Sequence, residues 1–288
     1  MVLTTLFENS PYVNLPFNLI GWVGWFVLAA LIIWVLRKHF SLEVNERYWW
    51  TFGILAFASL AVSIIFVVKI QETGAVPLPK IPQEITSPII QLFIAIPWII
   101  AAGLLGIWPA VTFAFLAGVI TAFWGTHNVF TPLEFAFGAL LVALALRQNF
   151  RSKVFTWLRT PLGAGIGAAL LFTPLFLLTT FFSTNGNLAA RLDFAFTQSW
   201  QSMLTNALQL ILAGFACEVF HLVKIKSWVK IKNLVPSPFE TGLQDRVLYI
   251  SLPLVIVLLL TLAITDWVVA GKSAREMMET RLESTAKV

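Results

Sequence analysis

The chain has 288 residues, of which 58% are hydrophobic and 11% charged, and its mean hydropathy is +0.84. Soluble domains carry about 25% charged residues, so this composition excludes a soluble protein and indicates residence in a lipid bilayer. The net charge of +5 does not indicate a nucleic-acid partner, because the Lys and Arg residues lie mainly in the loops between apolar segments, where topology signals belong.

Eight apolar segments follow one another along the chain, and several reach the roughly 20 residues that cross a bilayer. They predict membrane-spanning helices over residues 17–36, 49–68, 89–107, 110–124, 132–146, 161–182, 199–223 and 247–270. The fold class is therefore all-α, a polytopic integral membrane bundle over residues 1–270. The first residues lack the cationic segment of a signal peptide, so we expect the first span to be retained.

Proline and small residues predict how the spans are joined and packed. Four prolines between residues 69 and 88 predict an irregular loop, because proline cannot continue a helix at that density. Trp108 and Pro109 predict a tight turn between the third and fourth spans. The run Gly163-Ala164-Gly165-Ile166-Gly167 predicts a face on which another helix can approach closely. Cys217 is the single cysteine and is expected to be a small core residue.

The distribution of basic residues predicts the orientation of the bundle. The loops after spans one, three, five and seven hold twelve Lys and Arg residues, whereas the loops after spans two, four and six hold three. Loops rich in Lys and Arg stay on the cytoplasmic side. We therefore expect both termini outside, in a bacterial cytoplasmic membrane with lipid as the surrounding partner.

One acidic residue, Glu134, lies close to membrane depth at the start of the fifth span. An acid at that depth indicates a proton or cation site. The alternative, which we prefer from the sequence, is that Thr131-Pro132-Leu133-Glu134 is a capping box, with Thr131 as N-cap and Glu134 at N3. Ser237-Pro238-Phe239-Glu240 repeats that pattern before the eighth span.

The seventh span carries polar residues at steps of three and four, which places them within one narrow stripe of a helix. These residues are Gln198, Ser202, Thr205, Asn206 and Gln209. Such a stripe is expected to face the bundle interior or a cavity rather than lipid. Two interpretations stay open: hydrogen bonding between helices, or contact with a ligand. Gln198, Ser202, Asn206 and Gln209 are the candidate ligand-facing residues of this span.

Other chemistry-bearing residues give weaker indications. His127 follows the fourth span and is either a solvated loop histidine or a residue that contacts a ligand. Glu218 and His221 have the spacing of half a di-metal site, but no second copy exists, so we expect Glu218 to pair with His221 or Lys224. Three histidines and one cysteine do not predict a metal site. The sequence predicts no catalytic residue, no cofactor and no enzyme activity within this chain.

The C-terminal segment, residues 271–288, is charged and rich in helix formers. Ala274, Met278 and Leu282 fall on one face of an amphipathic helix that continues out of the eighth span. The pattern stops without a cap, a glycine or a proline. We expect this segment to begin an extracytoplasmic helix whose remainder lies beyond residue 288, and to pair in a homodimer or pack on the rest of an outer domain.

This junction of a final span with AREMMETRLESTAKV at residues 274–288 resembles bacterial sensors in which a membrane helix enters an extracytoplasmic Cache-type domain. The resemblance implies an ectodomain, a return span and a cytoplasmic output such as a histidine kinase or a cyclic-di-GMP enzyme beyond this chain. Residues 96–146, with the turn Gly106-Ile107-Trp108-Pro109, resemble membrane sensor segments that share a plan with vitamin-uptake S-components. The acidic residue of those segments is absent here, so no ligand chemistry is carried over.

Three functions follow as expectations. The leading one is a membrane-embedded sensory or signal-input module of a bacterial signalling protein with a small-molecule ligand. The alternatives are a small-molecule uptake component or transporter, and a structural membrane subunit of a larger complex.

Overall fold

A computed structural model describes residues 2–4, 11–16, 18–39, 46–65, 67–69, 89–184, 188–197, 200–224, 228, 234–237, 251, 255 and 258. The chain divides into two compact units, Met1–Leu234 and Val235–Val288. The elements of the first unit are, in chain order, β1 (Val2–Thr4), α1 (Leu19–Lys38), α2 (Glu46–Ile64), β2 (Val67–Lys69), β3 (Ile89–Gln91), α3 (Ile96–Leu104), α4 (Ile107–Thr121), the π-helix η2 (Ala122–Thr126), α5 (Thr131–Arg147), α6 (Lys153–Leu158), α7 (Pro161–Ser183), α8 (Leu188–Thr197) and α9 (Trp200–Lys224).

Four described helices are long and apolar enough to cross a membrane: α1, the continuous run Ile107–Thr126, α7, and Met203–His221 within α9. Large apolar side chains point away from the protein along these helices, as at Leu19, Phe26, Leu170 and Phe215. Exposed apolar surface of this kind is expected where a helix meets lipid. The prediction of a helical membrane protein is therefore confirmed. The predicted eighth span and the C-terminal segment fall almost entirely outside the described residues.

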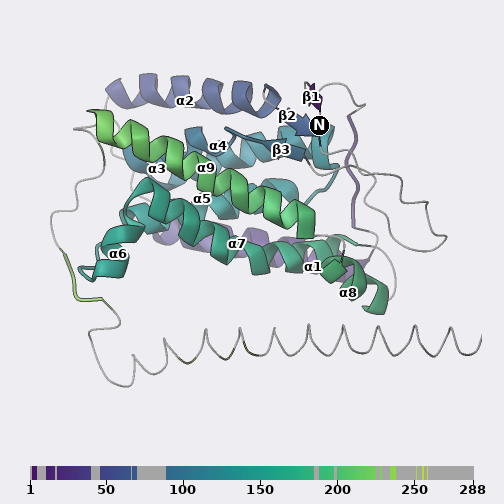
Figure 1. Ribbon diagram of the computed structural model, residues 1–288. Coiled ribbons are helices and arrows are strands. Elements are labelled where there is room, and N and C mark those ends of the chain that lie inside the picture. The colour runs from purple at the N-terminus through teal and green to yellow at the C-terminus, as the bar shows by residue number, and fades with distance from the viewer. Residues whose placement is uncertain are drawn as a thin grey trace, which may run out of the picture. The chain divides into compact units, whose positions relative to one another are not determined.

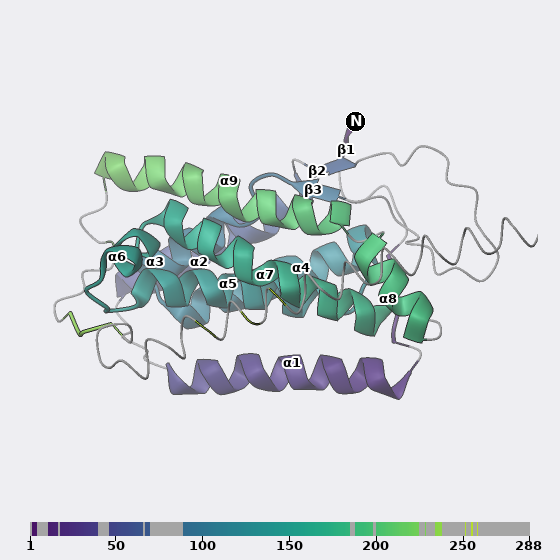
Figure 2. The same ribbon diagram turned by 60° about the horizontal axis from the view of Figure 1, so that its bottom comes forward.

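Helix α5 lies at the centre of the first unit, where it packs against α3, α4 and α7. Figures 1 and 2 show the longer helices running broadly alongside one another around it. Small side chains such as Ala136, Ala139 and Ala143 are fully or almost fully buried in α5 and let the neighbouring helices approach. Gly118 of α4 serves the same purpose, because a Cβ there would lie 2.7 Å from the Cα of Pro132.

The third predicted span, residues 89–107, is not one helix. Residues 89–91 form strand β3 of an antiparallel sheet with the order β1-β2-β3, and α3 occupies only residues 96–104. The side chain of Gln91 ties this strand to the bundle, since its Nε2 donates to the Ser63 carbonyl oxygen at the end of α2 and to Thr121 Oγ1 of α4. Pro97 then stands in the first turn of α3, where its missing N–H costs no hydrogen bond.

The turn between α3 and α4 is at Gly106, two residues before the predicted Trp108–Pro109 turn. Gly106 has φ 134°, a conformation that side chains with a Cβ rarely adopt. Trp108 and Pro109 belong to the first turn of α4, which tolerates proline. The predicted basic and polar loops also contain the short helices α6 and α8, which the sequence analysis missed.

The predicted small-residue face of α7 is confirmed and packs against α9. A Cβ at Gly165 would lie 2.7 Å from the Leu210 carbonyl oxygen, and one at Gly214 would lie 2.8 Å from the Pro161 carbonyl oxygen. Backbones this close leave no room for side chains at these two positions. The glycines therefore determine how α9 lies against α7.

This contact predicts that Gly214→Val destabilises the protein. Overpacking typically costs about 1–3 kcal/mol of unfolding free energy, and here the obstacle is backbone, which cannot move aside. Gly53→Val is the matched control, because a Cβ at Gly53 of α2 meets none of the described residues within 4 Å. The thermal unfolding midpoint in detergent measures both variants, and equal midpoints would contradict the close packing of α7 and α9.

Candidate functional site

A buried carboxylate lies between α5 and α7. Glu134, in the first turn of α5, is only 3% exposed, and Thr179 Oγ1 of α7 donates a hydrogen bond to its Oε1. Thr179 itself is 2% exposed. An ionisable side chain inside a membrane bundle is costly to bury and is a candidate functional group for that reason.

The capping-box prediction for Thr131 and Glu134 is wrong. The Thr131 hydroxyl forms a 2.6 Å hydrogen bond with Thr126 Oγ1 instead of capping α5. Asn128 organises the start of α5, because its Oδ1 accepts from Phe130 N and its carbonyl oxygen accepts from Thr131 N. With the helix start held in this way, the Glu134 side chain turns into the bundle and contacts Thr179.

The polar stripe of α9 faces the bundle interior where the structure describes its side chains. Thr205 and Gln209 are buried and Asn206 is half-buried, whereas Leu204 and Leu208 on the other side of the helix are exposed. The predicted orientation of the stripe is therefore confirmed for these three residues. Gln198 lies outside the described residues, and so does the side chain of Ser202.

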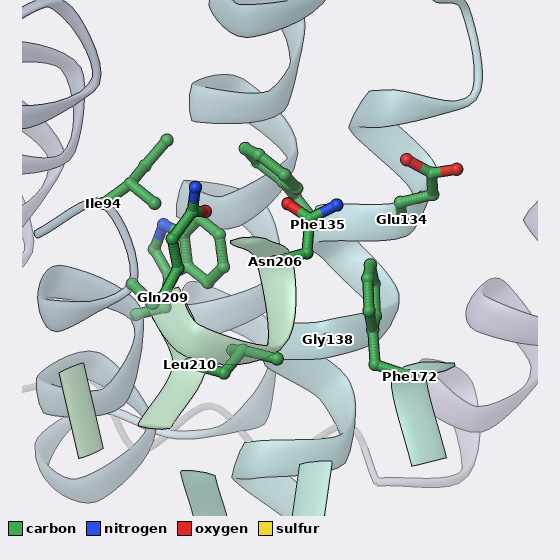
Figure 3. A pocket seen from close by; sticks show the side chains of 10 residues that line it. Ile94, Glu134, Phe135, Gly138, Phe172, Asn206, Gln209 and Leu210 are labelled. Carbon is green, nitrogen blue, oxygen red and sulfur yellow. The ribbon is translucent and has the colours of Figure 1, made fainter. Parts of the chain in front are cut away.

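Glu134, Asn206 and Gln209 line one pocket, which Figure 3 shows from close by. Asn206 and Gln209 come from α9 and Glu134 from α5, so residues 70 or more positions apart meet there. The other lining residues are Ile94, Ala95, Trp98, Phe135, Gly138, Phe172 and Leu210. The cavity volume of about 10 Å³ corresponds to one water molecule. We call this group the polar pocket.

His127 does not belong to the polar pocket, and it is not a solvated loop residue. It is 2% exposed, has φ 52°, and its ring stacks on Tyr12 with 3.6 Å between the ring centroids. Its Nδ1 lies 2.9 Å from the Tyr12 carbonyl oxygen, and its own carbonyl oxygen accepts from Asn14 N. His127 thus holds the segment 11–16 against the end of η2. The sequence showed no signal for this contact, because the two partners are far apart in the chain.

Glu218 and His221 also have partners other than the predicted ones. Glu218 Oε2 accepts from Leu162 N, 3.1 Å away, and so satisfies the first turn of α7. The His221 ring contacts Trp228 edge-on at 5.1 Å. Within the part of the chain that the structure describes, no three His, Cys, Asp or Glu residues lie close enough to hold a metal ion. The buried position predicted for Cys217 is confirmed.

Gln91 and Trp98 are buried side chains with polar groups that the sequence did not mark as candidates. Gln91 is the one amide in the apolar run 89–107, and that isolation is a signal that it needs a partner. Trp98 lines the pocket from α3 and packs on Phe135, with 5.2 Å between the ring centroids. Tryptophans usually mark the membrane surface, so the sequence gave no reason to place this one inside.

Comparison of the chain with protein-family models, curated proteins and solved structures finds no match. The functional assignment therefore depends on the chemistry of the polar pocket.

The contact between Glu134 and Thr179 predicts that Thr179→Val lowers the free energy of unfolding by about 1–3 kcal/mol, because a buried carboxylate loses a donor. Thr173→Val is the matched control in the same helix. The Thr173 hydroxyl donates only to the Ala169 carbonyl oxygen of its own helix, so its loss should change stability by about 0.5 kcal/mol or less. Thermal unfolding in detergent measures both. In a Glu134→Gln background the cost of Thr179→Val should shrink, and an unchanged cost would refute the pairing.

Proposed function

We propose that this chain is the membrane-embedded input module of a signalling protein, and that the polar pocket is its ligand-facing site. The observation that carries the proposal is that Glu134 of α5 and the two amide residues Asn206 and Gln209 of α9 line one pocket inside the bundle. Polar groups at membrane depth are expensive to bury and mark sites of function.

The place of the pocket in the bundle suits a sensor. Its walls come from α3, α5, α7 and α9, together with the segment that precedes α3, so a change in hydrogen bonding there alters how several helices pack. A signalling module requires a ligand to favour one packing arrangement over another.

The proposal extends to the topology. Eight spans with both termini outside the bacterial cytoplasmic membrane agree with the distribution of Lys and Arg residues. In this arrangement the amphipathic segment 271–288 leaves the eighth span on the outer side. Pairing of this segment with that of a second copy covers its apolar face and lets it carry a small shift between the membrane and an outer domain.

A substitution in the pocket tests the coupling between pocket and C-terminal segment. Asn206→Leu removes an amide from the pocket wall, so we expect it to change the pattern of disulfide cross-linking between copies that carry single cysteines at positions 274–286. Leu208→Ala, on the exposed side of α9, is the control and should leave the pattern unchanged. Cross-linking in cell membranes, in a Cys217→Ala background of the full-length protein, measures this. If the Asn206→Leu protein is normally abundant and its cross-linking pattern is unchanged, the pocket does not take part in signalling.

Single cysteines in the same background test the topology. Cysteines at Ser41, Ser152 and Ser227 should be shielded from a membrane-impermeant thiol reagent in intact cells, because the basic loops that contain them are cytoplasmic. Cysteines at Ser87, Ser183 and Ser284 should react. Labelling at Ser227 without cell lysis is incompatible with eight spans.

A further inference from the structure

The indole N–H of Trp98 is an unexplained group in the polar pocket. Trp98 is 3% exposed, and its Nε1 has no hydrogen-bond partner among the residues that the structure describes. A buried donor without an acceptor is costly, and almost all buried polar groups in native proteins are paired with protein or with ordered water. Because Trp98 lines the pocket, an acceptor placed there is a ready partner for it.

The dimensions and lining of the pocket match one water molecule. A volume of about 10 Å³ is close to the space that a single water needs. A buried water also needs two to four polar partners, according to the usual coordination of such waters. The Trp98 indole carries a donor, and the side chains of Glu134, Asn206 and Gln209, which line the same pocket, carry oxygen acceptors. Phe135, Phe172 and Leu210 close the remainder with apolar surface (Figure 3).

We propose that the polar pocket is a binding site for a single ordered water molecule, which accepts a hydrogen bond from Trp98 Nε1–H and donates to the side-chain oxygens of the pocket. This water joins α3 to α5 and α9, and it is the smallest ligand that satisfies the Trp98 donor. The inference goes beyond the proposed function, because the site holds water whether or not the protein signals.

Gly138 provides a precise way to displace this water. A Cβ at Gly138 would lie 3.7 and 3.8 Å from two Phe172 ring atoms and 4.0 Å from Leu210 Cδ1, which are ordinary contact distances. An alanine therefore fits without moving the helices, and its methyl group enters a space that holds one water. Glycine in a helix interior is less favourable than alanine, so Gly138→Ala stabilises the protein unless the methyl group disrupts something bound there.

The test measures the Trp98 indole resonance in the full chain, labelled with ¹⁵N-tryptophan and held in detergent micelles. Trp98→Phe identifies that resonance among the 12 tryptophans. We expect a cross-relaxation peak between the Trp98 indole proton and water, and its loss in Gly138→Ala. Gly53→Ala is the control, because its Cβ meets none of the described residues within 4 Å, and it should retain the peak.

Thermal unfolding gives an independent readout with opposite signs for the two variants. Gly53→Ala should leave the unfolding midpoint unchanged or raise it, whereas Gly138→Ala should lower it, because displacing a well-ordered water loses its hydrogen bonds. A Trp98 indole without a water peak in the parent protein overturns the proposal, as does a Gly138→Ala midpoint raised as far as that of Gly53→Ala. If the water peak is present but Asn206→Leu leaves the cross-linking pattern unchanged, only the proposed signalling function is refuted.

Discussion

The contact between α7 and α9 determines where the polar side chains of this bundle meet. Gly165 lies directly against the Leu210 carbonyl oxygen, and Gly214 lies against that of Pro161. Asn206 is one helical turn before Leu210, so the contact that seats Leu210 on α7 also turns Asn206 toward the interior. Larger residues at the two glycines would move α9 away and separate its amides from Glu134. The polar pocket thus depends on two positions that carry no side chain.

Backbone groups at the two ends of a helix have no partner within that helix. Side chains from neighbouring helices supply such partners here. The Glu218 carboxylate accepts from Leu162 N at the start of α7, and Arg147 Nε donates to the Ala102 carbonyl oxygen near the end of α3. Both charges have the sign that stabilises the helix end they contact. Gln91 serves the end of α2 in the same way without a charge. These links join helices that the chain itself does not place next to each other.

The polar pocket differs from those links because its polar side chains line a common cavity inside the bundle. Glu134 is held by Thr179, while Asn206, Gln209 and Trp98 approach from α9 and α3. A structural role alone would be fulfilled by apolar residues of the same size, which pack in a membrane bundle without a desolvation cost. The free-energy cost of burying these groups is the physical basis of the function proposed above.

The sequence by itself determined the membrane class, most helix positions, the close-packing face of α7 and the inward orientation of the α9 stripe. These properties follow from hydrophobicity and helical periodicity, which are local in the chain. Only the tertiary structure decided that Glu134 faces Thr179, that residues 89–91 form a strand, and that His127 is covered by Tyr12. In each case a local pattern competed with a partner between 20 and 115 positions away, and the buried contact with the distant partner contributed more to stability than the local pattern did.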